Sequence, residues 1–100
     1  ILDFSKMKNR DLDLDLKSVD LHQISDLVLV ISRPLFVTKN LQVRNNIPFD
    51  FAHVLADEAR IQQILFNLIG NAIKFTEKGR IELNAAITER FAKITISDTG

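Results

Sequence analysis

The sequence lacks cysteine altogether, contains only two histidines, and has no excess of either charge. Without cysteine the chain has neither disulfide bonds nor thiolate metal ligands, a composition that fits a reducing compartment. Lys and Arg total 13, as do Asp and Glu, so the basic surplus typical of nucleic-acid-binding domains is absent. The longest apolar run, residues 27–31, is far shorter than a membrane span.

The composition that remains is that of a folded domain. Hydrophobic residues make up 46% of the 100 residues and charged residues 26%, which predicts one small domain or part of one. The chain begins without an initiator Met or a signal peptide, and it stops directly after a predicted strand. We therefore expect it to be a piece of a longer protein.

Alternation of apolar and polar residues predicts the strands. It is strict over residues 12–17, where interspersed charges indicate a strand near a sheet edge. Similar patterns predict a short strand over residues 41–45, a minor one over 53–56, and two longer ones over 80–88 and 91–97. Residues 89–90, between the strands over 80–88 and 91–97, are predicted to form a hairpin loop.

Helical spacing of apolar residues predicts two helices. The first covers residues 21–35, with Ser18 or Asp20 as its cap, and Pro34 should kink it or end its regular part near Ser32. The second covers residues 57–76 and is capped by Asp57. The order strand, helix, strand, helix, hairpin predicts helices on one face of a mixed or antiparallel sheet, which is an α/β two-layer sandwich.

The second helix has two opposed faces when its residues are placed about 100° apart. The predicted apolar face consists of Ile64, Leu65, Leu68, Ile69, Ala72 and Phe75. The opposite face carries a polar stripe of Arg60, Gln63, Asn67, Asn71 and Lys74.

The two asparagines of the polar stripe weaken a helix, yet they recur at one-turn spacing, which invites a functional explanation. On this pattern alone an ordinary polar face in contact with solvent is an equal alternative. Amide oxygens suit Mg²⁺, and a lysine ammonium suits phosphate. The stripe is therefore chemically suited to the phosphates of a Mg²⁺-bound nucleotide.

Residues 60–76 closely resemble the N box of sensor histidine kinases, with agreement in residue type over most of the string. Residues 94–100 resemble the start of the same family's G1 box. Residues 1–6 resemble the end of the dimerisation helical hairpin of hybrid-type kinases. The resemblance implies the Bergerat-type ATP-binding fold of histidine kinases and Hsp90, truncated before the lid. Residues 1–8 would end the phosphoacceptor hairpin, and residues 9–100 would form the N-terminal part of the ATP-binding catalytic domain.

The resemblance also implies roles for individual residues, with ATP and Mg²⁺ as cofactors. Asn71 would coordinate Mg²⁺, while Asn67 and Lys74 would contact the phosphates. Phe75 would lie near the adenine, whose exocyclic amine Asp98 would bind, and Gly100 would allow close approach of the backbone to the base. No single catalytic residue is assigned. Chaperone and topoisomerase relatives carry a Glu at the position of Asn67, where it activates water. An amide there favours phosphate transfer over hydrolysis.

The implied function is transfer of the ATP γ-phosphate to a histidine on a separate helical domain, in two-component signalling. Partners would be that phosphoacceptor domain, the receiver domain of a response regulator, and a second copy of the kinase. The implied location is the cytoplasm, with any attachment to the inner membrane made by segments outside this sequence. The 100 residues alone are expected to be inactive. His22 and His53 match no phosphoacceptor site.

Two alternatives compete with this interpretation. Asp98–Thr99–Gly100 is also the triplet of aspartic proteases, but that site needs a folded loop after the triplet and two copies that share a proton. We reject it because nothing follows Gly100 in this sequence. The second alternative is a structural or protein-interaction fragment of an ATPase-like domain, with weak or no nucleotide binding.

Overall fold

The computed structural model describes residues 14–99. The predicted hairpin end at residues 1–8 and the predicted site residue Gly100 therefore lie outside the described residues. Over the described residues the chain forms β1 (Leu16–Val19), α2 (Leu21–Thr38), β2 (Gln42–Asn45), β3 (Val54–Asp57), α3 (Glu58–Phe75), β4 (Arg80–Thr88) and β5 (Phe91–Asp98).

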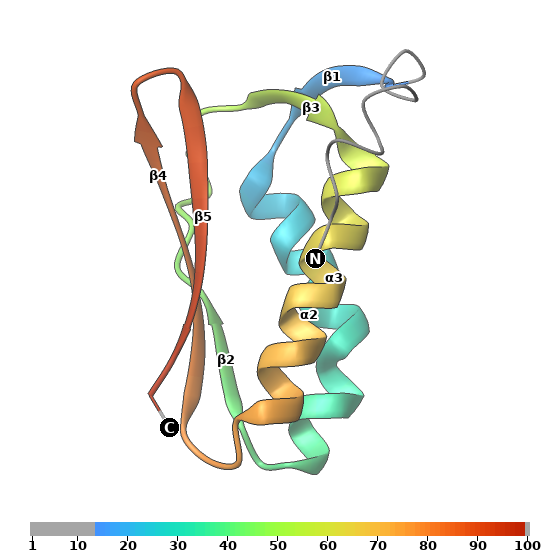
Figure 1. The fold of residues 1–100 in the computed structure, drawn as a ribbon, viewed down its shortest axis with the longest axis vertical. Coiled ribbons are helices and arrows are strands. Elements are labelled where there is room, and N and C mark those ends of the chain that lie inside the picture. Colours follow the sequence, from blue (N-terminus) through green and yellow to red (C-terminus); the bar gives the residue numbers. More distant parts are fainter. Residues whose placement is uncertain (1–13, 100) are drawn as a thin grey trace.

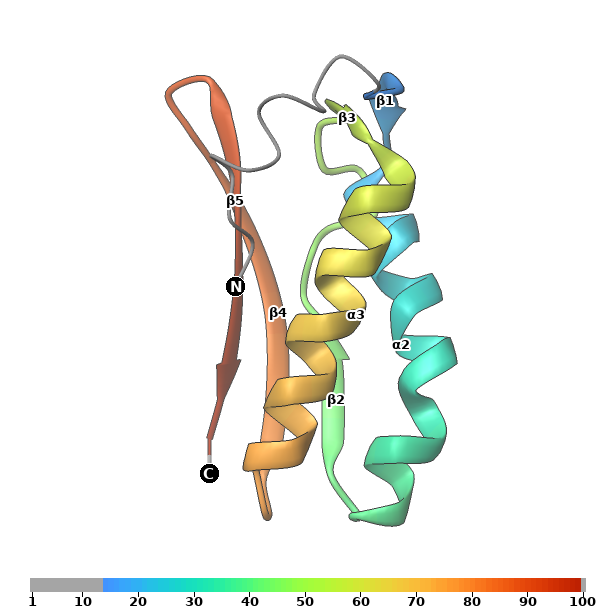
Figure 2. The ribbon, with the colours of Figure 1, turned by 45° about the vertical axis from the view of Figure 1, so that its right-hand side comes forward.

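The strands form two sheets. In the larger one β4 lies in the centre, parallel to β2 and antiparallel to β5, with Val43 opposite Ile81 and Leu83 opposite Ile96. The predicted two-layer α/β fold is confirmed, since both helices lie on one face of this mixed sheet (Figures 1 and 2). The smaller sheet pairs β1 with β3 in antiparallel fashion. It was not predicted as a separate sheet, because its strands have only four residues each.

Helix α2 begins and ends with specific backbone caps. The Asp20 carboxylate accepts a hydrogen bond from the N–H of Gln23 at 3.1 Å, so Asp20 is the cap. At the other end Asn40 adopts a left-handed conformation (φ 59°), and the N–H of Leu41 donates to the carbonyl of Phe36 at 2.9 Å. This closing turn is a Schellman motif, which confirms the predicted helix exit at residues 39–40.

Two predictions for this part of the chain are wrong in detail. Helix α2 does not end near Ser32 but continues through Pro34 to Thr38. An internal proline costs a helix about 3 kcal/mol, yet α2 retains helical structure for four residues beyond Pro34. The first strand is Leu16–Val19, whereas alternation predicted residues 12–17. Ser18 accordingly belongs to the strand and not to the cap.

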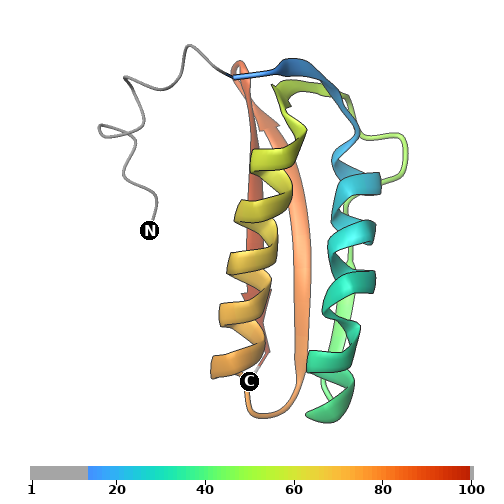
Figure 3. The ribbon, with the colours of Figure 1, turned by 90° about the vertical axis from the view of Figure 1, so that its right-hand side faces the viewer.

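The core lies between the larger sheet and the two helices. Its fully or nearly fully buried aliphatic side chains are Val19, Leu21, Ile24, Val28, Leu41, Ile47, Leu65, Ile69, Ile73, Ile81 and Leu83. Figure 3 shows α2 and α3 side by side in front of the sheet. Among residues 14–99, neither helix combines the length and apolar composition needed to cross a bilayer.

The orientation of α3 differs from the predicted apolar face. Leu65, Ile69 and Ile73, which are spaced one turn apart, are buried. Leu68 is 48% exposed and Phe75 is 76% exposed, although both were placed on the apolar face. Because α3 contacts the sheet along one narrow line, residues at the margin of its apolar face remain in solvent.

The neighbouring residues Ile69 and Leu68 provide a direct test of this orientation. The substitution Ile69→Ala should lower the free energy of unfolding by about 2–5 kcal/mol, because it leaves a cavity in a closed core. Leu68→Ala should lower it by less than about 1.5 kcal/mol, since half of that side chain is already in water. Urea unfolding followed by circular dichroism measures both. Equal losses would show that α3 is turned toward the predicted face.

Candidate functional site

Helix α3 carries most of the predicted site, and Asp57 determines where it begins. Asp57 is both the last residue of β3 and the cap of α3. Its carboxylate accepts hydrogen bonds from the N–H of Asp15 at 3.2 Å and from the N–H of Arg60 at 3.3 Å, and lies 3.6 Å from the Arg60 guanidinium. The bond from Asp15 is the largest cause of a pKa below the usual value for this carboxyl, with Arg60 adding to it.

The polar stripe of α3 lies opposite its buried face. Asn67, Asn71 and Lys74 are exposed, whereas Leu65, Ile69 and Ile73 on the other side of the helix are buried. The exposure predicted for these three residues of the stripe is therefore confirmed, although the apolar face is only partly as predicted. Neither the Asn67 nor the Asn71 amide forms a hydrogen bond within residues 14–99, so both remain available to a ligand there.

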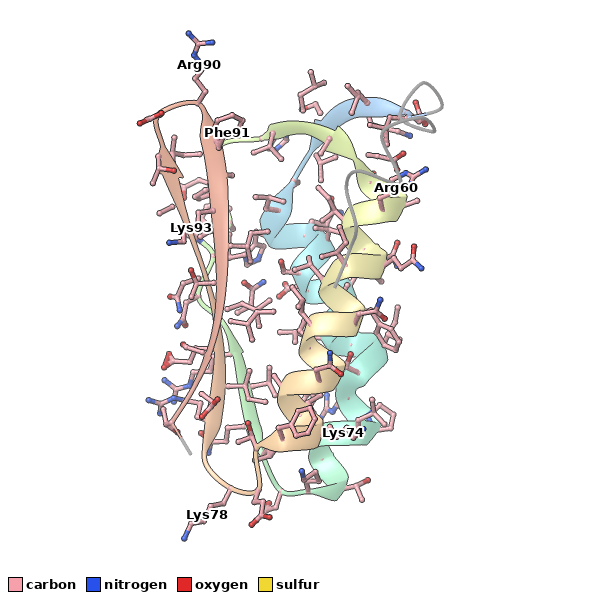
Figure 4. The ribbon with its side chains drawn as sticks, viewed as in Figure 1. Arg60, Lys74, Lys78, Arg90, Phe91 and Lys93 are labelled. Carbon is pink, nitrogen blue, oxygen red and sulfur yellow. The ribbon has the colours of Figure 1, made fainter. Side chains whose placement is uncertain are left out.

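The last turn of α3 brings a cation and an aromatic ring together. The Lys74 ammonium lies 5.4 Å from the centre of the Phe75 ring, within the range of a cation–π contact. Figure 4 shows Lys74 near the end of α3 opposite to Arg60. The backbone of this turn is held from outside the helix, because the Lys39 ammonium donates to the carbonyls of Ile73 at 2.7 Å and Lys74 at 3.2 Å.

Asp98 ends β5 and is exposed. The next residue is tied to the start of β4: the N–H of Thr99 donates to the Arg80 carbonyl, and the Thr99 hydroxyl accepts from the Arg80 N–H, both at 2.9 Å. The end of β5 and the last turn of α3 lie at the same end of the molecule in three views (Figures 1–3). The fold thus brings Asp98 to the end of the molecule where Lys74 and Phe75 lie.

The donor set on α3 fits Mg²⁺ in one specific way. Among residues 14–99, no three His, Asp or Glu side chains form a group that could hold a metal ion. The amides of Asn67 and Asn71 are neutral oxygen donors one turn apart, and Lys74 supplies a positive charge next to them. Mg²⁺ commonly keeps waters and shares substrate phosphates with only one or two protein ligands. The stripe therefore suits Mg²⁺ carried on a phosphate ligand better than a free ion.

The two histidines have structural partners away from this site. Nδ1 of His22 lies 2.6 Å from the Ile47 carbonyl oxygen, and its Nε2 lies 3.3 Å from the Asp26 carboxylate. His53 contacts the Ser18 hydroxyl at 3.2 Å. Both contacts link α2 or β1 to the loop before β3, so neither ring faces the stripe of α3.

Comparison with known proteins identifies the class. Residues 56–100 match the family described as "Histidine kinase-, DNA gyrase B-, and HSP90-like ATPase". The chain is 36% identical over 109 residues to the autoinducer 2 sensor kinase/phosphatase LuxQ of Vibrio vulnificus, covering 100% of this chain and 12% of that protein. The chain thus spans about one eighth of the length of this relative.

Solved structures of histidine kinases agree with this assignment. Full-length ShkA, solved in complex with AMPPNP, is 32% identical with a TM-score of 0.80, covering 88% of this chain and 19% of ShkA. The histidine kinase AdeS of Acinetobacter baumannii has the same fold, with a TM-score of 0.83 at 24% identity, over 96% of this chain and 48% of AdeS.

The two-layer fold and the amide-bearing helix therefore define a histidine kinase-, gyrase B- and HSP90-like ATPase domain. Within that class the chain belongs to the ATPase domains of sensor histidine kinases. The resemblance of residues 60–76 and 94–100 to the N box and G1 box of sensor histidine kinases is confirmed.

Two contacts at the site were missed by the sequence. Lys39 was interpreted only as part of a helix exit, and Thr99 only as part of the G1 box. Each forms its bonds with a segment distant in the chain, 34 residues away for Lys39 with Ile73 and 19 for Thr99 with Arg80. Spacing along one helix or strand carries no signal for such contacts, and only the fold reveals them.

Substitution of Asp57 should make stability less dependent on pH. Asp57→Asn keeps an N-cap side chain but removes the charge that accepts from Asp15 and pairs with Arg60. Because the folded pKa lies below the ordinary 3.8, this contribution is present above pH 3.8 and is lost as pH falls through the folded pKa. The variant should melt below the wild type at pH 7, with the gap closing in acid. A gap that stays constant down to pH 2 would contradict this role.

Proposed function

We propose that the protein carrying this chain is a histidine protein kinase that transfers the γ-phosphate of ATP to a histidine on a separate helical domain. The observation that carries the proposal is the stripe of Asn67, Asn71 and Lys74 on the exposed face of α3, opposite the core. Membership of the sensor kinase ATPase domains supports it. ShkA, which shares the fold and 32% identity, was solved with AMPPNP, an ATP analogue.

Residues of the stripe would bind the phosphate end of the nucleotide. Asn71 would hold Mg²⁺ through its amide oxygen, and Asn67 and Lys74 would contact phosphate oxygens directly or through water. When bound, Mg²⁺ would neutralise charge that develops on the phosphates during transfer. The chain's own residues would orient the nucleotide and supply positive charge, which are the main protein contributions in phosphoryl transfer.

The nature of residue 67 supports transfer over hydrolysis. An amide cannot take a proton from water at neutral pH, so Asn67 cannot act as a general base. A site without such a base at this position leaves the terminal phosphate available to a stronger nucleophile, such as the imidazole of an incoming histidine. The phosphate would then pass to the ring nitrogen, and ADP would leave.

The base of the nucleotide would lie toward the end of the larger sheet at which β5 ends. Phe75, 76% exposed, offers a flat apolar surface, and Asp98 at the end of β5 offers an acceptor for the adenine exocyclic amine. Gly100 would let the backbone approach the base. Guanine carries a carbonyl in place of that amine, so it would face the Asp98 carboxylate with an acceptor and be disfavoured.

In this proposal the partners are the phosphoacceptor histidine domain of the same kinase, the receiver domain of a response regulator, and a second kinase subunit. The domain would work on the cytoplasmic side of the inner membrane or free in the cytoplasm.

A second candidate function is a non-catalytic interaction module. The observation favouring it is the exposure of large apolar residues at the end of the molecule that carries the β4–β5 hairpin. Leu55 is 73% exposed and Phe91 is 71% exposed, and both line a hollow of about 500 Å³ with His53 and Ile87. Such a surface suits a protein contact. The kinase proposal requires measurable nucleotide binding that depends on the α3 stripe. The interaction module requires no nucleotide binding.

The substitution Asn71→Ala in the full-length protein tests the kinase proposal. It should reduce Mg²⁺-dependent autophosphorylation on histidine by a factor on the order of 100 or more, the size of effect seen when one preorganised charge-stabilising group is removed. Asn84→Ala is the matched control, because Asn84 is an exposed asparagine on β4 outside the site. Normal autophosphorylation of the Asn71→Ala protein would refute the role given to Asn71. No nucleotide binding by the wild type would favour the interaction module.

Substitution of Asp98 tests the base contact separately. Asp98→Ala should weaken Mg-ATP binding and reduce the preference for ATP over GTP by at least about tenfold, because the acceptor for the adenine amine is lost. Competition of the two nucleotides against a fluorescent ATP analogue measures the preference. Ser97→Ala, one residue earlier on β5, serves as the control. An unchanged ratio would remove Asp98 from the base site.

A further inference from the structure

Lys39 makes a contact that its position in the sequence does not suggest. It is the C-cap residue of α2, yet its ammonium donates to two carbonyls in the last turn of α3, Ile73 at 2.7 Å and Lys74 at 3.2 Å. The last carbonyls of a helix have no donor within the helix. Within the described range, the chain after α3 satisfies only the Ala72 carbonyl, through the N–H of Thr76 at 3.0 Å. Lys39 therefore completes the end of α3 from a different helix.

The charge of Lys39 has no other evident use within the described part of the chain. It forms no ion pair with a carboxylate of residues 14–99, although several carboxylates there pair with other cations. A cation at the C-terminal end of a helix is stabilised by the negative end of the helix dipole, and charge-assisted bonds are stronger than neutral ones. The contact is thus directed at the end of α3 itself.

The segment that follows Lys39 is attached to the sheet. The backbone of Asn40 closes the Schellman turn, and three residues after Lys39 the N–H of Gln42 donates to the Gly79 carbonyl at 3.3 Å. Gln42 is also the register partner of Arg80 in the parallel pair of β2 and β4. Residues 39–42 therefore contact the last turn of α3 at one end and the start of β4 at the other.

The start of β4 in turn holds the segment after Asp98, through the two bonds between Arg80 and Thr99. A continuous series of contacts thus runs from the Lys74 carbonyl, through residues 39–42 and Arg80, to Thr99. Its two ends are next to the two parts of the candidate site, Lys74 with Phe75 on α3 and Asp98 on β5.

From this geometry we infer that Lys39 is a positioning residue for nucleotide binding. It fixes the last turn of α3, which carries Lys74 and Phe75 and directly follows Asn71, relative to the end of the sheet that carries Asp98. The inference rests on the proposed nucleotide site. Because both donor bonds of the ammonium are to backbone carbonyls, Lys39 acts through the residues of α3 and does not itself contact the phosphates.

The test uses the full-length protein with Lys39→Met, Lys39→Arg and the control Lys78→Met. Lys78 lies in the turn after α3, is exposed, and points away from the fold (Figure 4), so its loss removes one positive charge at the same end of the molecule without the carbonyl contacts. Calorimetric titration with Mg²⁺ and AMPPNP gives the Kd. It is carried out at a temperature at which circular dichroism shows every variant fully folded.

Lys39→Met should weaken binding by about tenfold, since a turn of α3 that has lost this contact spends less time in the binding-competent arrangement, and the apparent Kd rises in proportion. Lys39→Arg should restore most of the affinity, because its guanidinium can reach the same carbonyls. Lys78→Met should bind within about twofold of the wild type. A role confined to stability would instead lower the melting temperature of Lys39→Met while leaving the Kd of the folded protein unchanged, and that result would overturn the inference.

Two further outcomes separate this inference from the proposed function. If Asn71→Ala weakens binding and Lys39→Met does not, the result supports the nucleotide site and contradicts the positioning role of Lys39. If the wild type binds no Mg²⁺–AMPPNP, the proposed function fails and the inference fails with it. Should Lys39→Met not fold, Lys39→Gln takes its place, since it keeps a polar head without the charge and should shift the Kd in the same direction.

Discussion

Burial of one face of α3 against the sheet is the constraint on which the rest of the structure depends. Leu65, Ile69 and Ile73 belong to the same buried core cluster as Ile81 and Leu83 of β4, and each buried aliphatic side chain contributes about 1.5–3 kcal/mol. The polar stripe opposes helix formation slightly, because asparagine is a poor helix former. The core therefore decides the rotation of α3, and the exposure of Asn67 and Asn71 on the opposite side follows from it.

The two ends of α3 are held by charged groups from other elements. At the start, the Asp57 carboxylate joins the first turn to the segment before β1. At the end, the Lys39 ammonium joins the last turn to α2. An anion at the N-terminus and a cation at the C-terminus both match the helix dipole and both satisfy backbone groups that the helix leaves free. The helix that carries the site is thus fixed along its length by apolar burial and at its ends by charge.

Features that depend on local periodicity were predictable from the sequence, and features that depend on distant contacts were not. Local residue spacing, together with cap and turn residues, was enough to predict four features. These are the range of α3, its Asp57 cap, the β4–β5 hairpin and the polar stripe. The continuation of α2 through Pro34 was not predicted, because the local preference of a proline does not by itself decide where a helix ends. The exposure of Phe75 was also missed, since periodicity gives the apolar side of a helix but not the width of the surface that covers it.

The shape of the α3 surface bears on the chemistry that the proposed site has to perform. Hydrolysis within one domain favours a closed pocket that holds a single water against an acidic base. Transfer to a histidine on another domain instead requires that the terminal phosphate be reachable from outside. The hollows between α2 and α3 and beside β3 contain none of the predicted site residues in their linings. Asn67, Asn71 and Lys74 instead lie on the exposed face of α3. In the proposed function, the amide at residue 67 is therefore the feature that favours a protein side chain over water as the phosphate acceptor, since an amide supplies no base to activate a water molecule.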